Sequence, residues 1–406
     1  MRLALLSPLP PEQTGIADHA AQCRAAWNQA GIDVLTPLLG QRPITSLAAA
    51  KAWVAERDWR RIDVVHAELG AGRLAEYYTL CALAALPHRP ALSATVHEPD
   101  RLVWQPVGGL ARWALDSAWV PSGLASLLAG LSQPLALMAE RRLARHLDGV
   151  VTLTQSGGQR LVKRLKLHAD RVSVIPHGVA AVPVRPLPPL EPLRVLHFGF
   201  IQRGKGIEDL IDAVGRLRAQ QPDLAGRVRL TIAGGTAADA GLRRGRSYLD
   251  ELRARVERRG LTPQVDWELN VDGRDIPELV QRHHLVVVPT RAPRGLGLFG
   301  RPSGASGAQA WALACGRGVI VSDARAQAED MTGGHGVAYP QGDVAALTRQ
   351  LLAVLNEPQV LQRWAEQSAT LAPQRLWPLT GQRFAGHFQR AVERSPRGAV
   401  APTTRL

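Results

Sequence analysis

The sequence predicts two doubly wound α/β domains in tandem, each built on a parallel sheet with helices on both faces. Two observations predict this class. Short runs rich in leucine, valine and isoleucine alternate with longer runs of helical spacing, which favours a parallel sheet buried on both faces. A proline-rich segment interrupts the alternation at residues 182–192, and the same alternation then starts again.

The first half of the chain begins with a short strand and alternates regularly from there. Apolar runs predict strands at residues 3–6, 32–35, 62–66, 91–97, 149–153 and 172–175. Composition and spacing predict helices at residues 17–30, 47–56, 74–86, 139–146 and 159–167. Residues 117–139 carry no charge, yet their prolines leave an apolar piece shorter than the roughly 20 residues that span a bilayer. A buried helix and a segment facing a membrane surface or an acceptor both remain open for this stretch.

The segment VPVRPLPPLEP at 182–192 carries five prolines, which can continue neither a helix nor a central strand. We therefore expect an N-terminal domain at 1–181, a linker at 182–192 and a C-terminal domain at 193–376. The pattern predicts strands in the second domain at 193–198, 228–233, 265–269, 285–289, 319–321 and 337–339, and helices at 207–217, 248–259, 276–283, 308–315, 344–355 and 361–371.

The end of the chain is expected to form a helix at 377–394 that returns to the N-terminal domain, followed by a disordered tail at 395–406 that lacks a core pattern. Ligands of open parallel sheets bind beyond the carboxyl ends of the strands. Two such domains that face each other would therefore share one interdomain cleft.

Composition narrows the class of partner. The formal net charge of +14 favours an anionic partner such as a phosphate group or an acidic membrane surface. The charge is spread along the chain without a nucleic-acid-binding block, so we expect no nucleic-acid partner.

Three well-separated cysteines show no disulfide framework and no zinc-type spacing, so we expect no metal site and a reducing compartment. Residues 1–7 read as a strand, because their apolar run is too short for a secretion signal.

A loop rich in glycine and serine at 295–307 leaves a predicted strand and leads into a predicted helix. The free N–H groups and the dipole at a helix start favour an anion. Ser306 and Gly307 fall at this start, and Arg301 lies upstream as a charged partner. The pattern indicates a phosphate site, and an ordinary glycine-rich turn is the alternative that stays open.

Three motifs occur in a fixed order: IPHGV at 175–179, GFIQRGKG after the strand at 193–198, and RPSGASGAQAWALACGRGVIVSD at 301–323. Together with Glu329, this ordered set resembles the family 4 glycosyltransferases of the GT-B fold. The resemblance implies transfer of a hexose from a nucleotide-diphosphate sugar with retention of anomeric configuration. It implies no cofactor beyond that donor substrate, and a glycan or lipid-linked acceptor in surface polysaccharide or glycoconjugate synthesis. The donor would lie against the second domain and the acceptor against the first.

The resemblance also assigns residues at the donor diphosphate. Lys205 matches the family lysine that contacts this group. The usual arginine partner, just after Gly199, falls on Phe200, so Arg203 is the nearest substitute. Arg301, Ser306 and Gly307 fall in the loop beside the donor phosphates.

Two further departures concern the donor sugar and the ribose. Many family members carry two glutamates eight residues apart, and these positions fall on Ser303 and Trp311. Trp311 cannot accept a hydrogen bond from a ribose hydroxyl. In the first domain, Gly15 matches a glycine that lets the backbone approach the donor phosphates. His97 matches a histidine that faces the reacting sugar, where it would bind a donor hydroxyl or the leaving phosphate.

The expected catalysis is electrostatic and metal-independent: lysine, arginine and backbone N–H groups stabilise the leaving diphosphate. His66 and Glu68 would line the acceptor side. The departures favour one alternative, a non-catalytic GT-B relative that acts as a binding or scaffold partner.

Basic helices of the first domain would dock on anionic lipid at the inner face of the cytoplasmic membrane, through Arg141, Arg142, Arg145, Arg160, Lys163, Arg164 and Lys166.

Overall fold

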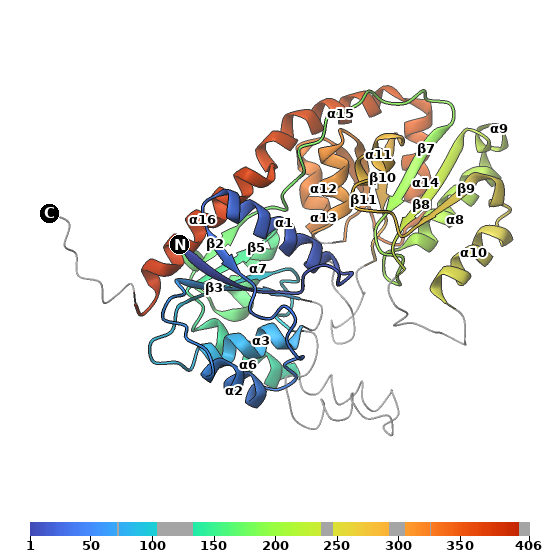
Figure 1. Ribbon diagram of the computed structural model, residues 1–406. Coiled ribbons are helices and arrows are strands. Elements are labelled where there is room, and N and C mark those ends of the chain that lie inside the picture. The colour runs from blue at the N-terminus through green and yellow to red at the C-terminus, as the bar shows by residue number, and fades with distance from the viewer. Residues whose placement is uncertain (71–72, 104–132, 237–246, 292–304, 325, 398–406) are drawn as a thin grey trace, which may run out of the picture. The chain divides into compact units, whose positions relative to one another are not determined.

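The computed structural model describes residues 1–70, 73–103, 133–236, 247–291, 305–324 and 326–397. The chain forms two compact units, each around a six-stranded parallel sheet (Figure 1). Among the described residues, the first unit contains the chain up to Pro176 and again from Trp377, and the second contains 177–291 and Ala305–Leu376. The predicted class of two doubly wound α/β domains is therefore confirmed.

The first sheet has the strand order β2-β1-β3-β4-β5-β6. Its strands are β1 (Arg2–Leu6), β2 (Asp33–Leu35), β3 (Val64–Leu69), β4 (Ala91–Val96), β5 (Gly149–Thr152) and β6 (Val172–Val174). From β1 the chain first adds β2 on one side and then β3 to β6 on the other. The order therefore reverses between β1 and β3, and the carboxyl ends of these two strands are where such sheets bind ligands.

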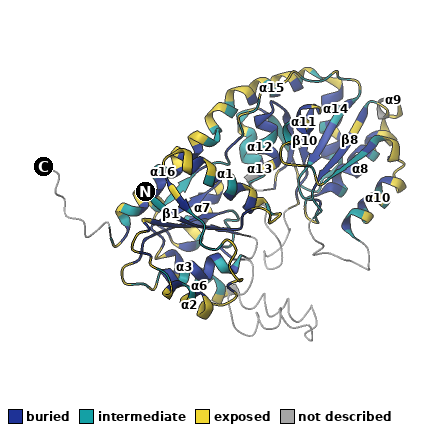
Figure 2. Ribbon diagram, viewed as in Figure 1, coloured by how far each residue is buried: buried dark blue, intermediate teal, exposed yellow. Residues whose placement is uncertain are grey.

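Alternate residues of each strand supply the two cores of this unit. Leu3 and Leu5 pack on one face, whereas Ala4 and Leu6 pack on the other. Two helices that run side by side in Figure 1 cover the Leu3 face, α1 (Gly15–Gln29) and α16 (Trp377–Arg394). The opposite face is covered by α2 (Leu47–Ala55), α3 (Leu74–Leu83), α6 (Gln133–Ala144) and α7 (Gln155–Leu165). In Figure 2 the central strands of this sheet are buried, its edge strands β2 and β6 are partly accessible, and the outer faces of the helices are exposed.

The helix α16 joins the first sheet through one stripe of side chains. Phe384, Phe388 and Ala391 recur at helical spacing and pack on Trp27 of α1 and on the Leu3 face. The tail begins later than expected, because Ser395 is buried and Arg397 donates to main-chain oxygens that include those of Ile62 and His88. Residues 398–406 of the predicted tail lie outside the described residues.

The second sheet has the order β12-β11-β10-β7-β8-β9, which reverses between β7 and β10. Its strands are β7 (Leu193–Phe198), β8 (Val228–Gly234), β9 (Val265–Leu269), β10 (Leu285–Val288), β11 (Gly318–Ser322) and β12 (Gly336–Tyr339). Its helices are α8 (Ile207–Gln220), α9 (Pro222–Ala225), α10 (Tyr248–Arg258), α11 (Ile276–Gln281), α12 (Gly307–Ala314), α13 (Ala326–Glu329), α14 (Val344–Asn356) and α15 (Gln359–Leu371). The helices α8, α10 and α14 cover one face, and α11 and α12 cover the other.

The uncharged stretch at 117–139 raises the question of membrane contact, and the structure describes only its last part. Residues 117–132 of the uncharged stretch lie outside the described residues, and α6 begins at Gln133. Among the described residues, no helix has both the length and the apolar content that crossing a bilayer requires.

The proline-rich segment is held to the second unit by Arg317, a fully buried residue just before β11. Its guanidinium donates to six main-chain oxygens, those of Arg185, Pro186, Gln281, His283, Cys315 and Gly316. Burial lowers the pKa of Arg317 from its ordinary value, yet the shift leaves an arginine charged at neutral pH. This one side chain therefore ties the segment to the ends of α11 and α12.

Replacing this guanidinium tests its role in the fold. Arg317→Met removes the charged donor and leaves buried carbonyl groups without a partner, so we expect the free energy of unfolding to fall by about 3 kcal/mol or more. Urea denaturation followed by tryptophan fluorescence measures the loss. Arg349→Met on the exposed side of α14 is the matched control and should change the value by less than about 0.5 kcal/mol. Equal urea midpoints for the two variants would contradict the assignment.

Candidate functional site

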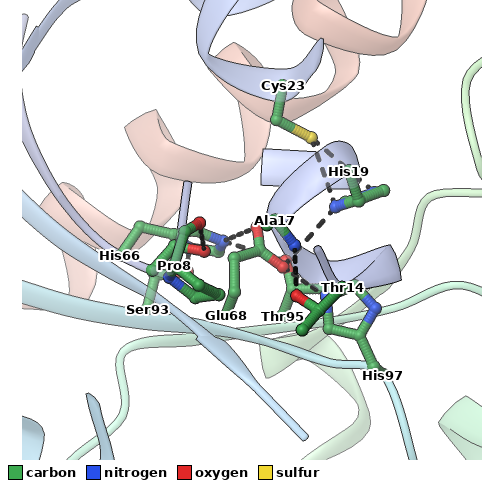
Figure 3. Close-up of polar contacts among 11 residues, drawn as sticks. Pro8, Thr14, Ala17, His19, Cys23, His66, Glu68, Ser93, Thr95 and His97 are labelled. Carbon is green, nitrogen blue, oxygen red and sulfur yellow. Dashed lines mark hydrogen bonds and ion pairs between the residues drawn. The ribbon is translucent and has the colours of Figure 1, made fainter. Parts of the chain in front are cut away.

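Four polar side chains gather where β1, β3 and β4 end (Figure 3). His66 and Glu68 belong to β3, and His97 directly follows β4. His19 lies one turn into α1, the helix that follows β1. Because the carboxyl ends of parallel strands share one edge of a sheet, this chain order brings the four together at the point where the strand order reverses.

Glu68 is the centre of this group, since all three imidazoles lie near its carboxylate. Its Oε2 lies 2.6 Å from Nε2 of His97 and 3.6 Å from Nδ1 of His19, and its Oε1 lies 3.5 Å from Nε2 of His66. Burial alone would raise the pKa of Glu68, but the imidazoles outweigh it and hold that pKa well below its ordinary value. Glu68 is therefore a carboxylate at neutral pH, and its Oε2 accepts a hydrogen bond from His97.

The polar contacts continue from His66 to the C-terminal helix. Nδ1 of His66 lies 2.9 Å from Oγ of Ser93, which lies 2.9 Å from Nε2 of His387 on α16. Nε2 of His66 lies 2.9 Å from Oγ1 of Thr95. Burial lowers the pKa of His387 to about 3, so its ring is neutral and serves as a hydrogen-bonding partner.

The structure corrects one expectation about this edge. His66 and Glu68 were expected to line the acceptor side, but both side chains are fully buried within the sheet and its covering helices. His97 is the member of the group that retains exposure, with 12% of its side chain accessible. A ligand can therefore reach His97, whereas Glu68 acts on a ligand only through its neighbours.

The same group has the composition of a metal site. Within the part of the chain that the structure describes, ligand atoms of His19, Glu68 and His97 lie within 4.8 Å of one another. Two imidazoles and a carboxylate are a set that binds Zn²⁺ in other proteins. Sequence patterns alone do not reveal this group, because its three members come from three separate elements. The one available signal was a carboxylate inside the otherwise uncharged strand VVHAEL.

In the second unit, the candidate donor residues follow the two strands at which the order reverses. Gly204 and Gly206 flank Lys205 in the turn between β7 and α8. A Cβ on Gly206 would lie 1.8 Å from the main-chain oxygen of Pro289, so the turn lies directly against the end of β10. The N–H of Arg291 also donates to the oxygen of Gly204 at 2.9 Å. The turn that carries Lys205 is thus fixed beside the strand that leads toward α12.

The ammonium of Lys205 lies close enough to His197 of β7 to influence its titration. Burial, helped by the positive charge of Lys205, lowers the pKa of His197 to about 4. Gly199, at the end of the same strand, has φ 138°, a backbone conformation that favours glycine. Its oxygen would lie 1.9 Å from a Cβ on Gly234, so the ends of β7 and β8 are also in close contact.

Within the described residues, the first turn of α12 lacks a side-chain cap. Ser306 is the residue before the helix, and its side chain makes no capping hydrogen bond to the N–H groups of the first turn. A Cβ on Gly307 would meet no atom within 4 Å, so the space in front of the first residue is open. A Cβ on Gly15 would likewise meet no atom within 4 Å, but the start of α1 is capped, because Oγ1 of Thr14 accepts from the N–H of Ala17 at 3.1 Å. Of the two helix starts, that of α12 is therefore the one that lacks a side-chain cap.

Four predicted donor-site residues remain: two lie outside the described residues, one forms an ion pair and one packs in the core. Arg301 and Ser303 lie outside the described residues. The guanidinium of Arg203 lies 2.5 Å from a carboxylate oxygen of Glu251 and stacks over the ring of Tyr248 at 4.9 Å. Its role as a diphosphate partner stays a prediction. Trp311 of α12 is partly buried and packs in the apolar core beside β10 and β11.

Family models match both halves of the chain. Residues 192–357 match the model described as "Glycosyl transferases group 1", and residues 10–181 match "Glycosyltransferase Family 4". A D-inositol 3-phosphate glycosyltransferase from Stackebrandtia nassauensis is 30% identical over 164 residues. That match covers 38% of this chain and 36% of the relative, so it spans little more than a third of the relative's length.

Solved structures show the same fold over nearly the whole chain. Anabaena Alr3699/HepE in complex with UDP has a TM-score of 0.62 at 18% identity, over 96% of this chain and 100% of that chain. A sucrose-phosphate synthase from Thermosynechococcus elongatus has a TM-score of 0.67 at 16% identity, over 96% of this chain and 98% of that chain. The two family models and this shared architecture show that the chain belongs to the family 4 glycosyltransferases of the GT-B fold.

Proposed function

We propose that the protein transfers a hexose from a nucleoside-diphosphate sugar to a glycan or lipid-linked acceptor, with retention of anomeric configuration. The reaction would serve the synthesis of a surface polysaccharide or glycoconjugate. One observation carries the proposal: Lys205 and the uncapped start of α12 follow β7 and β10, the neighbouring strands between which the order of the second sheet reverses. A cation and free N–H groups at such a point suit a diphosphate.

In the proposed reaction, the bond between the anomeric carbon and the diphosphate oxygen breaks, and negative charge grows on the leaving group. The ammonium of Lys205 and the N–H groups at Ser306 and Gly307 stabilise that charge from fixed positions, which is electrostatic catalysis. The positive charge comes from the protein itself, so the proposal requires no metal. The acceptor hydroxyl attacks the same face of the sugar that the diphosphate leaves.

The nucleotide and the sugar are proposed from the relatives. Anabaena Alr3699/HepE has been solved with UDP and with UDP-glucose. A Staphylococcus aureus TarM mutant, at 12% identity, has been solved with UDP and α-GlcNAc-glycerol. We therefore take UDP-glucose and UDP-GlcNAc as the first donors to test. In the first unit, His97 would contact the reacting sugar and Gly15 would admit a donor phosphate to the start of α1.

We also propose peripheral contact with the anionic inner face of the cytoplasmic membrane, through one stripe on α6 and the turn after it. Leu135 and Met138 are 68% and 66% exposed, and Arg142 and Arg145 continue the same helical spacing as exposed charges. Other basic residues of the predicted patch serve the fold. Arg141 donates to the oxygen of Arg164, Arg160 pairs with Asp100, and Arg164 pairs with Glu140.

Removing the lysine charge tests the transferase. Lys205→Met should lower kcat/KM for the best donor about 100-fold or more, because the growing charge on the diphosphate loses a fixed cation. A panel of nucleoside-diphosphate sugars, assayed for nucleotide release and by calorimetry, identifies that donor. Lys51→Met on the exposed side of α2 makes the same chemical change away from the site and should leave kcat/KM within about twofold.

Two results would count against this proposal. Near wild-type turnover in Lys205→Met would show that the lysine does not contact the diphosphate. Donor binding by wild-type protein without transfer to any acceptor would favour the non-catalytic alternative, a GT-B relative that binds or scaffolds a partner.

The membrane proposal has a separate test. The double variant Arg142→Glu/Arg145→Glu should lose flotation with phosphatidylglycerol vesicles, since each basic residue near such a surface contributes about 1 kcal/mol of attraction. Wild-type protein should float with these vesicles and not with phosphatidylcholine vesicles. Arg349→Glu on α14 reverses a charge elsewhere and should float like the wild type. Equal flotation of both charge-reversal variants would refute contact through α6.

A further inference from the structure

Glu68 occupies a position that disfavours a charge. It is the fifth residue of a strand whose six residues are all buried, between β1 and β4. A carboxylate removed from water is costly unless several donors compensate it, and an apolar pair often replaces a buried ion pair without loss of stability. The carboxylate depends on its donors, so its contacts are the place to look for its role.

The shortest of these contacts points to one partner. His97 Nε2 lies 2.6 Å from Glu68 Oε2, nearly 1 Å closer than the nitrogens of His19 and His66 lie to the carboxylate. Because Glu68 is ionised, it has no proton to donate, and Nε2 of His97 must carry the hydrogen of this bond. Figure 3 shows one ring nitrogen of His97 turned toward Glu68, and the other nitrogen, Nδ1, lies on the opposite side of the ring.

The surroundings hold the carboxylate in place for this contact. His66 is fixed by the hydroxyls of Ser93 and Thr95, and Ser93 is in turn bonded to His387 of α16. His19 packs edge-on against the ring of His97 with centroids 5.0 Å apart. His97 thus has one nitrogen held by a buried carboxylate, its ring packed at a right angle to that of His19, and 12% of its side chain accessible.

We propose that Glu68 is the positioning residue of His97, and that it presents Nδ1 of that ring to the hydroxyl and phosphate oxygens of a nucleoside-diphosphate sugar. This rests on the proposed function, since it assigns the atom of His97 that meets the donor. Glu68 itself touches no substrate. It fixes which nitrogen carries the proton and which way the ring faces, so the donor meets a preset partner.

The contact itself is testable without any activity. Two-bond ¹H–¹⁵N correlation spectra of the full chain with ¹⁵N-labelled histidine report which ring nitrogens carry protons, and the signals lost in His97→Gln identify His97. We expect a proton on Nε2 of His97 in the wild type. A neutral ring with its proton on Nδ1 would overturn the proposal, whether or not the protein proves to be a transferase.

Kinetics then separate positioning from a purely structural role. Glu68→Gln keeps the shape of the side chain and removes its charge, so kcat should fall about 10- to 100-fold while KM for the donor changes little. In a His97→Ala background the same change should have no further effect on kcat, because Glu68 acts through that ring. Glu76→Gln, at a buried ion-paired carboxylate on α3, is the matched control and should leave kcat within about twofold. Equal losses in kcat from Glu68→Gln with and without His97 would refute positioning.

Metal analysis decides the competing role of the same residues. We expect less than about 0.1 zinc per chain in the purified protein, as for a site held together by hydrogen bonds. One zinc per chain that is lost in Glu68→Gln would make His19, Glu68 and His97 metal ligands and would overturn the proposal.

Discussion

Both units depend on one constraint of parallel sheets. The connection that follows each strand crosses toward the side of the sheet on which the next strand lies. Where the strand order reverses, neighbouring connections diverge, and the two strand ends remain uncovered by either. The reversal lies between β1 and β3 in the first sheet and between β7 and β10 in the second. The polar residues with candidate roles gather at these points, and aliphatic side chains form most of the cores on the two faces of each sheet.

The two buried charges that matter most illustrate different uses of polarity inside a protein. Arg317 donates hydrogen bonds to main-chain oxygens of the proline-rich segment and of the ends of α11 and α12. One charged side chain therefore satisfies carbonyl groups that would otherwise need several separate partners. Glu68 has no comparable task, since its neighbours are side chains that could each be apolar.

The fold was predictable because fully buried strands leave uninterrupted apolar runs, and helices with one buried face repeat at their own spacing. The helix predicted from residue 139 begins at Gln133 instead, since its first turn carries no charged residue to mark an exposed face. Lys205 could be singled out because its loop, GFIQRGKG, resembles the family motif. The group around Glu68 could not, since His19 lies in a helix and the contact needs three-dimensional information. The sequence does not distinguish the buried Arg317 from the many solvent-exposed arginines of the chain. Arg203 pairs with Glu251, a partner that no local pattern reveals.

The first unit is discontinuous in sequence, since the chain leaves it after Pro176 and re-enters it at Trp377. The leaving and returning segments pair with each other at Val179 and Leu376. During synthesis on the ribosome, the face formed by Leu3, Leu5 and Val151 therefore lacks Phe384 and Phe388 until the entire second unit has been translated. In nascent chains the part of this face that α16 covers stays exposed until α16 is made, and truncation at a late codon would leave that part without its cover.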